Sequence, residues 1–118
     1  MDKLFFYSYP KCSTCRKASK WLDQNNINYK LIDIVKEPPT NFFLELALIQ
    51  FSEDKKKIFN TRGNSFKLLD IRINELSNEK IIELLSNDGK LIKRPFLIIN
   101  ESKLILGFNE SEYVANFK

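Results

Sequence analysis

Residues 9–22 read YPKCSTCRKASKWL and place two cysteines, Cys12 and Cys15, three positions apart. The apolar run LFFY at 4–7 precedes this stretch and is typical of a buried strand that feeds a loop. Apolar residues at helical spacing follow, so we expect a helix over 13–25. The two thiols therefore fall where the first strand gives way to the first helix.

The rest of the chain continues to alternate between strand and helix patterns. In order, these patterns predict a strand at 29–34, helical segments at 40–50, 53–59, 64–69 and 78–86, strands at 96–99 and 103–106, and a helix at 110–117. The order is βαβ, a helical insertion at about 40–90, and then ββα. We therefore expect an α/β, thioredoxin-like fold with a mixed four-stranded sheet, in a single domain over residues 1–118.

Two of these elements carry more specific expectations. The helix that Thr40 caps has its apolar pattern at Phe42, Phe43, Leu46 and Ile49. The last two strands are joined by a short polar connection, which predicts a β-hairpin, but this connection lacks the Asn-Gly pair that marks a tight turn.

The composition excludes several classes of protein. With 43% hydrophobic residues and three glycines, the chain is neither disordered nor fibrous. The net charge is +4, but basic and acidic residues are interspersed, so the cluster Lys55, Lys56 and Lys57 indicates a solvated face rather than a nucleic-acid patch. The N-terminal apolar run is too short to span a membrane and lacks a signal-peptide cleavage site. We expect a monomeric, cytoplasmic protein with no direct nucleic-acid or membrane partner.

The position of the two cysteines favours thiol chemistry. Unpaired N–H groups and the positive end of the helix dipole would stabilise Cys12 as a thiolate, because it lies just outside the first turn. Lys11 and Arg16 add positive charge nearby. Cys15 lies one turn deeper, where a thiolate is less favoured. On this interpretation Cys12 attacks a substrate and Cys15 resolves the resulting mixed disulfide.

Two other interpretations of the pair are open. In the first, both thiols are inert core residues, as cysteines on a helix face often are. Their placement at a helix start and their basic neighbours favour reactive thiols over this interpretation. In the other, they belong to a zinc site, but such a site needs four ligands and the chain has two cysteines and no histidine, so we expect no metal. The lack of histidine also excludes Cys-His hydrolase chemistry.

The chain resembles the ArsC/Spx family, which comprises the glutaredoxin-like arsenate reductases and their relatives. The resemblance rests on five segments that span nearly the whole chain: YPKCSTCRKASKWL at 9–22, EPPT at 37–40, FNTRG at 59–63, SNDGKLIKRPFLI at 86–98 and LGFNESEY at 106–113. These versions are most similar to the small "arsenate reductase family" proteins of Gram-positive bacteria. The resemblance implies a thioredoxin fold with a helical insertion between its halves.

The resemblance also implies where an anionic substrate would bind. Arsenate reductases of the family use one cysteine, at the position of Cys12, with glutathione and glutaredoxin as external reductants and three arginines around the oxyanion. Here one of those positions is Arg94, another falls on Asn60 with Arg62 two residues along, and the third falls on or beside Phe108. We therefore expect arsenate to be a poor substrate, because an amide and a phenyl ring cannot replace guanidinium groups. The candidate anion-binding residues are Arg94, Arg62, Asn60, Lys11 and Arg16.

The CxxC pair and the segment GFNESEY are more similar to the Spx branch of the family. Its members are regulators that bind the C-terminal domain of the RNA polymerase α subunit and use CxxC as a redox switch. They carry a polymerase-contacting glycine near the position of Phe51 and Ser52, and this chain has none there. The leading hypothesis is therefore a thiol-disulfide oxidoreductase, similar to arsenate reductases, that binds no cofactor and uses glutathione, glutaredoxin, thioredoxin or another small thiol as external reductant. The alternative is a redox-switched regulator that binds RNA polymerase.

The resemblance assigns a structural role to Pro95. Thioredoxin-like folds hold a cis-proline at the start of the third strand, opposite the CxxC, so the Arg94–Pro95 bond is expected to be cis although most X-Pro bonds are trans.

Overall fold

Four strands form one mixed sheet in the computed structural model of the protein, which describes residues 3–69 and 72–118. The strands are β1 (Leu4–Ser8), β2 (Lys30–Asp33), β3 (Phe96–Ile99) and β4 (Lys103–Leu106). The α-helices are α1 (Ser13–Gln24), α2 (Asn41–Gln50), α3 (Asn64–Leu69), α4 (Asn78–Asn87) and α5 (Glu110–Phe117), and the short 3-10 helices are η1 (Lys55–Ile58), η2 (Ile73–Glu75) and η3 (Gly89–Leu91).

The strand order in the sheet is β2-β1-β3-β4. β1 pairs in parallel with β2 and antiparallel with β3, and β3 pairs antiparallel with β4. The α/β fold class with a mixed four-stranded sheet, predicted from the residue patterns, is therefore confirmed. The predicted segment at 53–59 is shorter than expected and forms η1 alone.

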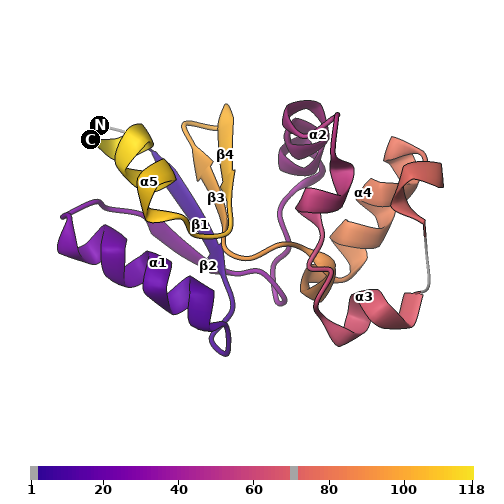
Figure 1. The fold of residues 1–118 in the computed structure, drawn as a ribbon, viewed down its shortest axis with the longest axis horizontal. Coiled ribbons are helices and arrows are strands. Elements are labelled where there is room, and N and C mark those ends of the chain that lie inside the picture. The colour runs from indigo at the N-terminus through magenta and orange to yellow at the C-terminus, as the bar shows by residue number, and fades with distance from the viewer. Residues whose placement is uncertain (1–2, 70–71) are drawn as a thin grey trace.

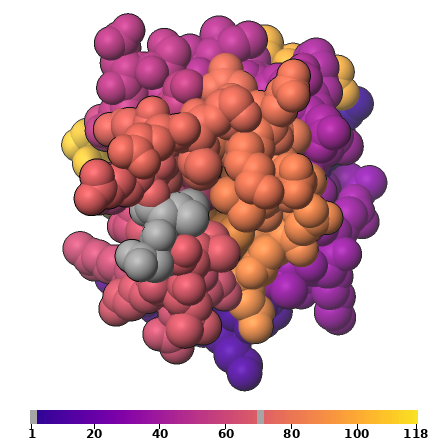
Figure 2. All heavy atoms as spheres, turned by 90° about the vertical axis from the view of Figure 1, so that its right-hand side faces the viewer, coloured from indigo at the N-terminus to yellow at the C-terminus, as the bar shows by residue number. Residues whose placement is uncertain are grey.

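Side chains that alternate along the strands fill two apolar cores, one on each face of the sheet. Leu4 and Phe6 of β1 pack with α1 and α5, while Tyr7 packs on the opposite face with α2 and α4. Figure 1 shows the same division, with α1 and α5 on one side of the sheet and α2, α3 and α4 on the other. In the space-filling view of Figure 2, this second side consists almost entirely of residues between β2 and β3.

α2 differs from its sequence pattern in the face that it buries. Phe43 and Leu48 are buried, but Phe42 and Ile49 are 60% and 73% exposed. The apolar residues of this helix lie nearly all round it, so helical spacing alone could not select the buried face.

Gln50, the last residue of α2, ties this helix to the edge strand β4. Its side-chain Nε2 donates to the carbonyl of Leu104 at 2.8 Å, and its Oε1 accepts from the N–H of Leu104 at 3.0 Å. The amide therefore satisfies backbone groups that an edge strand otherwise leaves unpaired.

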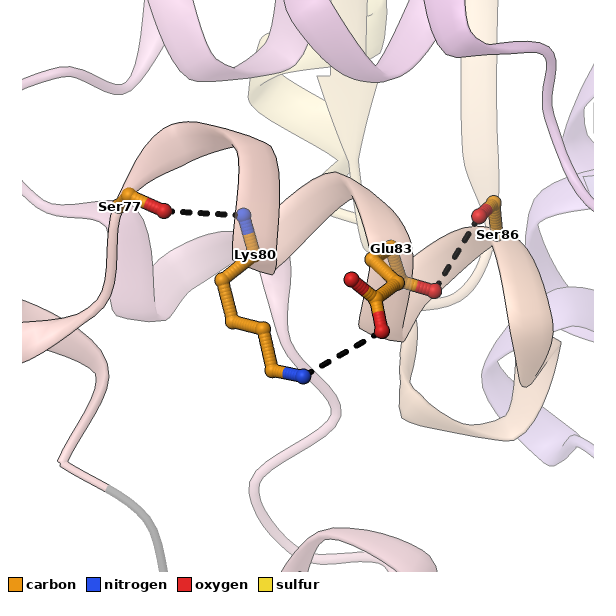
Figure 3. A network of polar contacts seen from close by, with 4 residues as sticks. All are labelled: Ser77, Lys80, Glu83 and Ser86. Carbon is orange, nitrogen blue, oxygen red and sulfur yellow. Dashed lines mark hydrogen bonds and ion pairs between the residues drawn. The ribbon is translucent and has the colours of Figure 1, made fainter.

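Close packing at Gly89 and a side-chain cap at the start of α4 stabilise the insertion. Gly89 is buried, and a Cβ there would lie 1.9 Å from the carbonyl oxygen of Ile34. At the start of α4, the Ser77 hydroxyl accepts from the N–H of Lys80 at 3.1 Å (Figure 3). The ammonium of Lys80 also pairs with Glu83 at 3.3 Å on the exposed face of the helix.

The β3–β4 connection shows how the hairpin forms without an Asn-Gly pair. Asn100 and Glu101 have φ angles of 52° and 57°, so two consecutive residues adopt the left-handed conformation of a hairpin turn. The N–H of Ser102 donates to the carbonyl of Ile99 at 3.1 Å and closes the turn.

None of the helices in the described part of the chain has the length and apolar character needed to cross a membrane.

Candidate functional site

Cys12 lies in the loop after β1 and is the N-cap residue of α1. Its N–H donates to the carbonyl of Tyr9 at 3.0 Å, which fixes the turn that leads into the helix. Its Sγ accepts a hydrogen bond from the N–H of Cys15 at 3.2 Å. Sulfur thus takes the place that a Ser or Asp oxygen usually has at a helix start, where the free N–H groups favour negative charge. The side chain is partly exposed, so reagents in solvent can reach it.

Cys15 lies in the first turn of α1 and differs from Cys12 in its surroundings. It is 1% exposed, and burial, followed by a hydrogen bond with Cys12, raises its pKa to about 11. Hydrogen bonds with the backbone of Tyr9 and the side chain of Ser8 oppose this shift. Both cysteines are free thiols. The pair therefore combines an accessible thiol with a buried thiol that holds its proton.

Tyr113 of α5 packs in the core between the sheet and α1, with its ring 5.5 Å from that of Trp21. It is fully buried, and its hydroxyl donates to the carbonyl of Gly107 at 3.3 Å. Burial raises its pKa, with smaller contributions from the charges of Glu112 and Cys15, so the phenol is close enough to Cys15 to sense its charge. The phenol therefore holds its proton in this core.

Arg94 lies just before β3 and contacts Tyr9 in the loop after β1. Its guanidinium carbon is 4.9 Å from the centre of the Tyr9 ring, in a cation-π contact. Arg94 and Tyr9 line a small pocket of about 240 Å³ together with Asn60, Lys90 and Ser65. Tyr9 connects this pocket to the loop that carries the accessible thiol, because its carbonyl accepts the Cys12 N–H; Cys12 itself does not line the pocket, which we call the pocket beside Cys12. Asn64 also lines it, so the pocket offers two cations, two amides and the Ser65 hydroxyl to a small anionic group.

The structure brings only some of the predicted anion-binding residues together. Arg94 and Asn60 share the pocket, whereas Arg62 is exposed and does not line it. Arg16 donates from Nη1 to the carbonyl of Pro10 at 3.0 Å and faces a different hollow of about 460 Å³. Lys11 is exposed beside Cys12 and lines neither hollow.

The sequence reasoning missed Lys90, Ser65 and Tyr9. A signal for Lys90 exists, since it lies four residues before Arg94 in the segment GKLIKR. No sequence pattern marks Ser65, because its place in the pocket depends on how α3 packs.

Phe108, at or beside the third anion-contact position, has a packing role. Its ring meets Tyr113 edge to face, with centroids 4.8 Å apart, and it is partly buried against the core under α1 and α5. Pro95 is buried, and its bond to Arg94 is cis. Its carbonyl accepts from the N–H of Gly107, the residue before Phe108, at 2.9 Å.

Within the described residues, no three His, Cys, Asp or Glu side chains gather as a metal site would require.

Comparison with known proteins gives consistent matches along the chain. The model of the ArsC family matches residues 7–116. The uncharacterised protein YusI of Bacillus subtilis strain 168 is 39% identical over 116 residues, which cover 97% of this chain and 98% of YusI. The global transcriptional regulator Spx of Enterococcus faecalis strain V583 is 35% identical over 92% of this chain and 82% of its own. A crystal structure described as a possible arsenate reductase, from Streptococcus mutans UA159, superposes with a TM-score of 0.89 at 38% identity and covers 99% of this chain and 100% of its own.

Proposed function

The chain belongs to the ArsC family, and from this premise we propose that it is a thiol-disulfide oxidoreductase whose redox couple is Cys12 and Cys15. One observation carries the proposal: the two thiols share a helix start, but one is accessible and the other is buried, with a pKa that burial raises. Cys12 is partly exposed and accepts a backbone N–H, while burial raises the pKa of Cys15 to about 11. This asymmetry supports one attacking and one resolving thiol.

In the proposed reaction, the Cys12 thiolate attacks one sulfur of a disulfide R–S–S–R. The Cys12–S–S–R bond forms, the R–S–S–R bond breaks, and RS⁻ departs. The Cys15 thiol then gives up its proton to solvent, and its thiolate attacks the Cys12 sulfur and expels the second RS⁻. Two electrons pass from the dithiol to the substrate, and the protein is left with a Cys12–Cys15 disulfide.

The environment of Cys15 suits this order of events. Burial is the main cause of its raised pKa, but the hydrogen bond and the negative charge of Cys12 raise it further. Both of these contributions disappear once Cys12 is bonded to a substrate sulfur. Cys15 therefore ionises more easily in the mixed disulfide than in the free dithiol, and it acts at the step that needs it.

The pocket beside Cys12 supports a substrate that carries an anionic group. Arg94 and Lys90 supply the positive charge, and Asn60 and Ser65 supply neutral hydrogen-bonding groups. Among the described residues a single guanidinium lines it, so the pocket offers at most one paired, planar contact to a tetrahedral oxyanion, where the resemblance implies three arginines in the arsenate reductases. We propose that arsenate is a poor substrate for this reason.

Regeneration of the dithiol needs an external reductant, because the proposed cycle leaves the protein oxidised. We propose glutathione with glutaredoxin, thioredoxin or another small thiol in this role, and no bound cofactor.

The test is multiple turnover of a model disulfide. Reduced protein is mixed with dithiodipyridine and either the glutathione, glutaredoxin and glutathione reductase system or the thioredoxin system, and NADPH consumption is followed. Glutathione and thioredoxin also reduce this reagent directly, so rates are measured against a blank without the protein. We expect turnover above this blank in at least one system, and none above it when Cys12 is replaced by Ser. If neither system gives more than one equivalent of reaction above the blank, the oxidoreductase proposal is wrong.

A second candidate function is a redox-switched transcription regulator that binds the C-terminal domain of RNA polymerase α. It is favoured by the 35% identity to a global transcriptional regulator, Spx of Enterococcus faecalis. The exposed Phe42 and Ile49 of α2 also offer an apolar surface to a partner protein. Against it, the position of Phe51 and Ser52 lacks the glycine that the resemblance to Spx implies.

The two functions are separated by binding and turnover measured on the same preparation. A regulator binds the purified polymerase domain in a manner that changes between the dithiol and disulfide forms, and it shows no turnover. An oxidoreductase shows turnover and no such binding.

A further inference from the structure

A further hollow, of about 430 Å³, lies where the insertion meets the end of β4 and the start of α5. It shares no lining residue with the pocket beside Cys12. Its volume is within the range of small-molecule sites, which run from roughly 300 to 1,000 Å³. The proposed redox chemistry makes no use of it.

Three lysines from two segments line this hollow. Lys56 and Lys57 come from η1, and Lys93 comes from the strand-like segment that leads into β3. None of the three forms an ion pair or a side-chain hydrogen bond with another described residue, although three other basic side chains do form ion pairs. These three exposed lysines outnumber the two carboxylates that line the same hollow by one, so its lining has a net positive charge that an anion can offset.

The path of Lys93 depends on Gly107. A Cβ at Gly107 would lie 3.2 Å from Cε of Lys93, so the lysine stem crosses directly over the glycine. Gly107 has φ of +75°, a backbone conformation that suits glycine. The turn between β4 and α5 thus leaves room for the exposed Lys93 side chain to lie over Gly107 at the hollow.

The other walls of the hollow are apolar or carry hydrogen-bonding groups. Phe51 and Leu106 are partly buried and give apolar contact, and Thr61 offers a hydroxyl. Asp54 and Glu112 place carboxylates at the same hollow. These carboxylates disfavour a bare inorganic anion but accept hydrogen bonds from a ligand that has hydroxyl or amine groups of its own.

From these features we propose that this hollow binds a small organic phosphate. The phosphate lies among Lys56, Lys57 and Lys93, a planar or apolar body contacts Phe51 and Leu106, and hydroxyl or amine donors of the ligand reach the two carboxylates.

Three probes separate the parts of this proposal, and none contains a thiol or a disulfide. Adenosine monophosphate carries all three features, adenosine lacks the phosphate, and inorganic phosphate lacks the body. Each is titrated into ¹⁵N-labelled, reduced full-length protein. Failure of the redox proposal would leave these results intact, because no redox step enters them.

We expect saturable shifts from adenosine monophosphate at the amides of Phe51, Lys57, Thr61 and Leu106. Adenosine and inorganic phosphate should each bind at least about tenfold more weakly, because each loses one set of contacts. Binding should also weaken as salt is raised, since the three lysines are exposed to solvent and their charges are screened by ions.

Variants test whether the lysines make the site. Lys93→Gln and Lys57→Gln should each weaken binding of adenosine monophosphate by about two- to fivefold. Lys103→Gln is the matched control, because Lys103 is exposed on β4 and does not line the hollow, and it should leave the affinity unchanged.

Three results would overturn the proposal. In the first, the shifts caused by adenosine monophosphate do not saturate. In the second, inorganic phosphate binds as tightly as the nucleotide. In the third, Lys103→Gln weakens binding as much as Lys93→Gln does.

Discussion

Replacing Arg94 by Gln should remove selectivity for anionic disulfides and leave the thiol chemistry in place. Arg94 is the one guanidinium in the pocket beside Cys12, and its Cζ lies 4.9 Å from the Tyr9 ring centre. A hydrogen bond to a charged group contributes about 1.5 to 3 kcal/mol, which corresponds to roughly 10- to 150-fold in rate or affinity. Lys90 is more exposed, so Lys90→Gln should cost no more than about 1 kcal/mol, or roughly fivefold.

The assay compares two disulfides with the same reduced protein under single-turnover conditions. Dithiobis(nitrobenzoic acid) carries a carboxylate on each ring, whereas dithiodipyridine is neutral. Arg94→Gln should lower the second-order rate constant for the anionic reagent by at least about tenfold and change that for the neutral reagent by less than about twofold. Arg62→Gln is the control, because Arg62 is exposed and lies outside the pocket.

The ratio of the rate constants for the anionic and the neutral reagent shows whether Arg94 acts on the substrate. If Arg94→Gln slows both reagents equally, Arg94 acts on the Cys12 thiolate rather than on the substrate. If neither rate changes, the pocket does not take part in recognition, and the anionic-substrate proposal is refuted.

Four further outcomes follow from the same geometry. Gly89→Ala should lower the free energy of unfolding by about 1 to 3 kcal/mol or more, because its Cβ would meet the Ile34 carbonyl at 1.9 Å, and a urea transition unchanged from wild type would contradict this packing. Gln50→Ala should cost about 1 to 3 kcal/mol in the same assay, since both backbone groups of Leu104 lose their partner. Labelling of Cys15 by iodoacetamide should be slow at neutral pH and still rising at about pH 10, because burial raises its pKa to about 11; a plateau below about pH 9 in peptide mass spectrometry would count against this environment. Arsenate should support little turnover in coupled assays with glutaredoxin or thioredoxin, and efficient, saturable reduction at low arsenate concentration would show that one guanidinium is enough.

The sequence predicted the strands and the order of elements well because their signals are local. The last two strands and the closing helix have the predicted bounds, since apolar runs and polar breaks alternate clearly there. The buried face of α2 could not be predicted in the same way. Phe42 and Phe43 are adjacent and equally apolar, and only the packing of α2 against α4 and the sheet decides which of them is buried.

The two cysteines of the candidate site could be predicted from the sequence, but only some of the residues that line the pocket around Arg94 could. The spacing of Cys12 and Cys15 and their place at a helix start follow from the sequence, and the helix geometry then sets which thiol is exposed. The pocket around Arg94 depends on three segments far apart in the chain. Arg62 was a reasonable candidate by sequence distance from Asn60, but the turn before α3 leaves it exposed, and Lys90 lines the pocket instead.

The central claim is that Cys12 attacks and Cys15 resolves, and mass spectrometry of the trapped adducts tests it most directly. Reduced wild-type protein, Cys12→Ser and Cys15→Ser are each treated with one equivalent of a small disulfide at neutral pH, quenched with acid and mapped by peptide. The account predicts a stable mixed disulfide on Cys12 in Cys15→Ser, little adduct in Cys12→Ser, and an adduct-free Cys12–Cys15 disulfide in wild type. An adduct that forms on Cys15 as fast as on Cys12, or a wild-type protein that keeps its adduct, would contradict it.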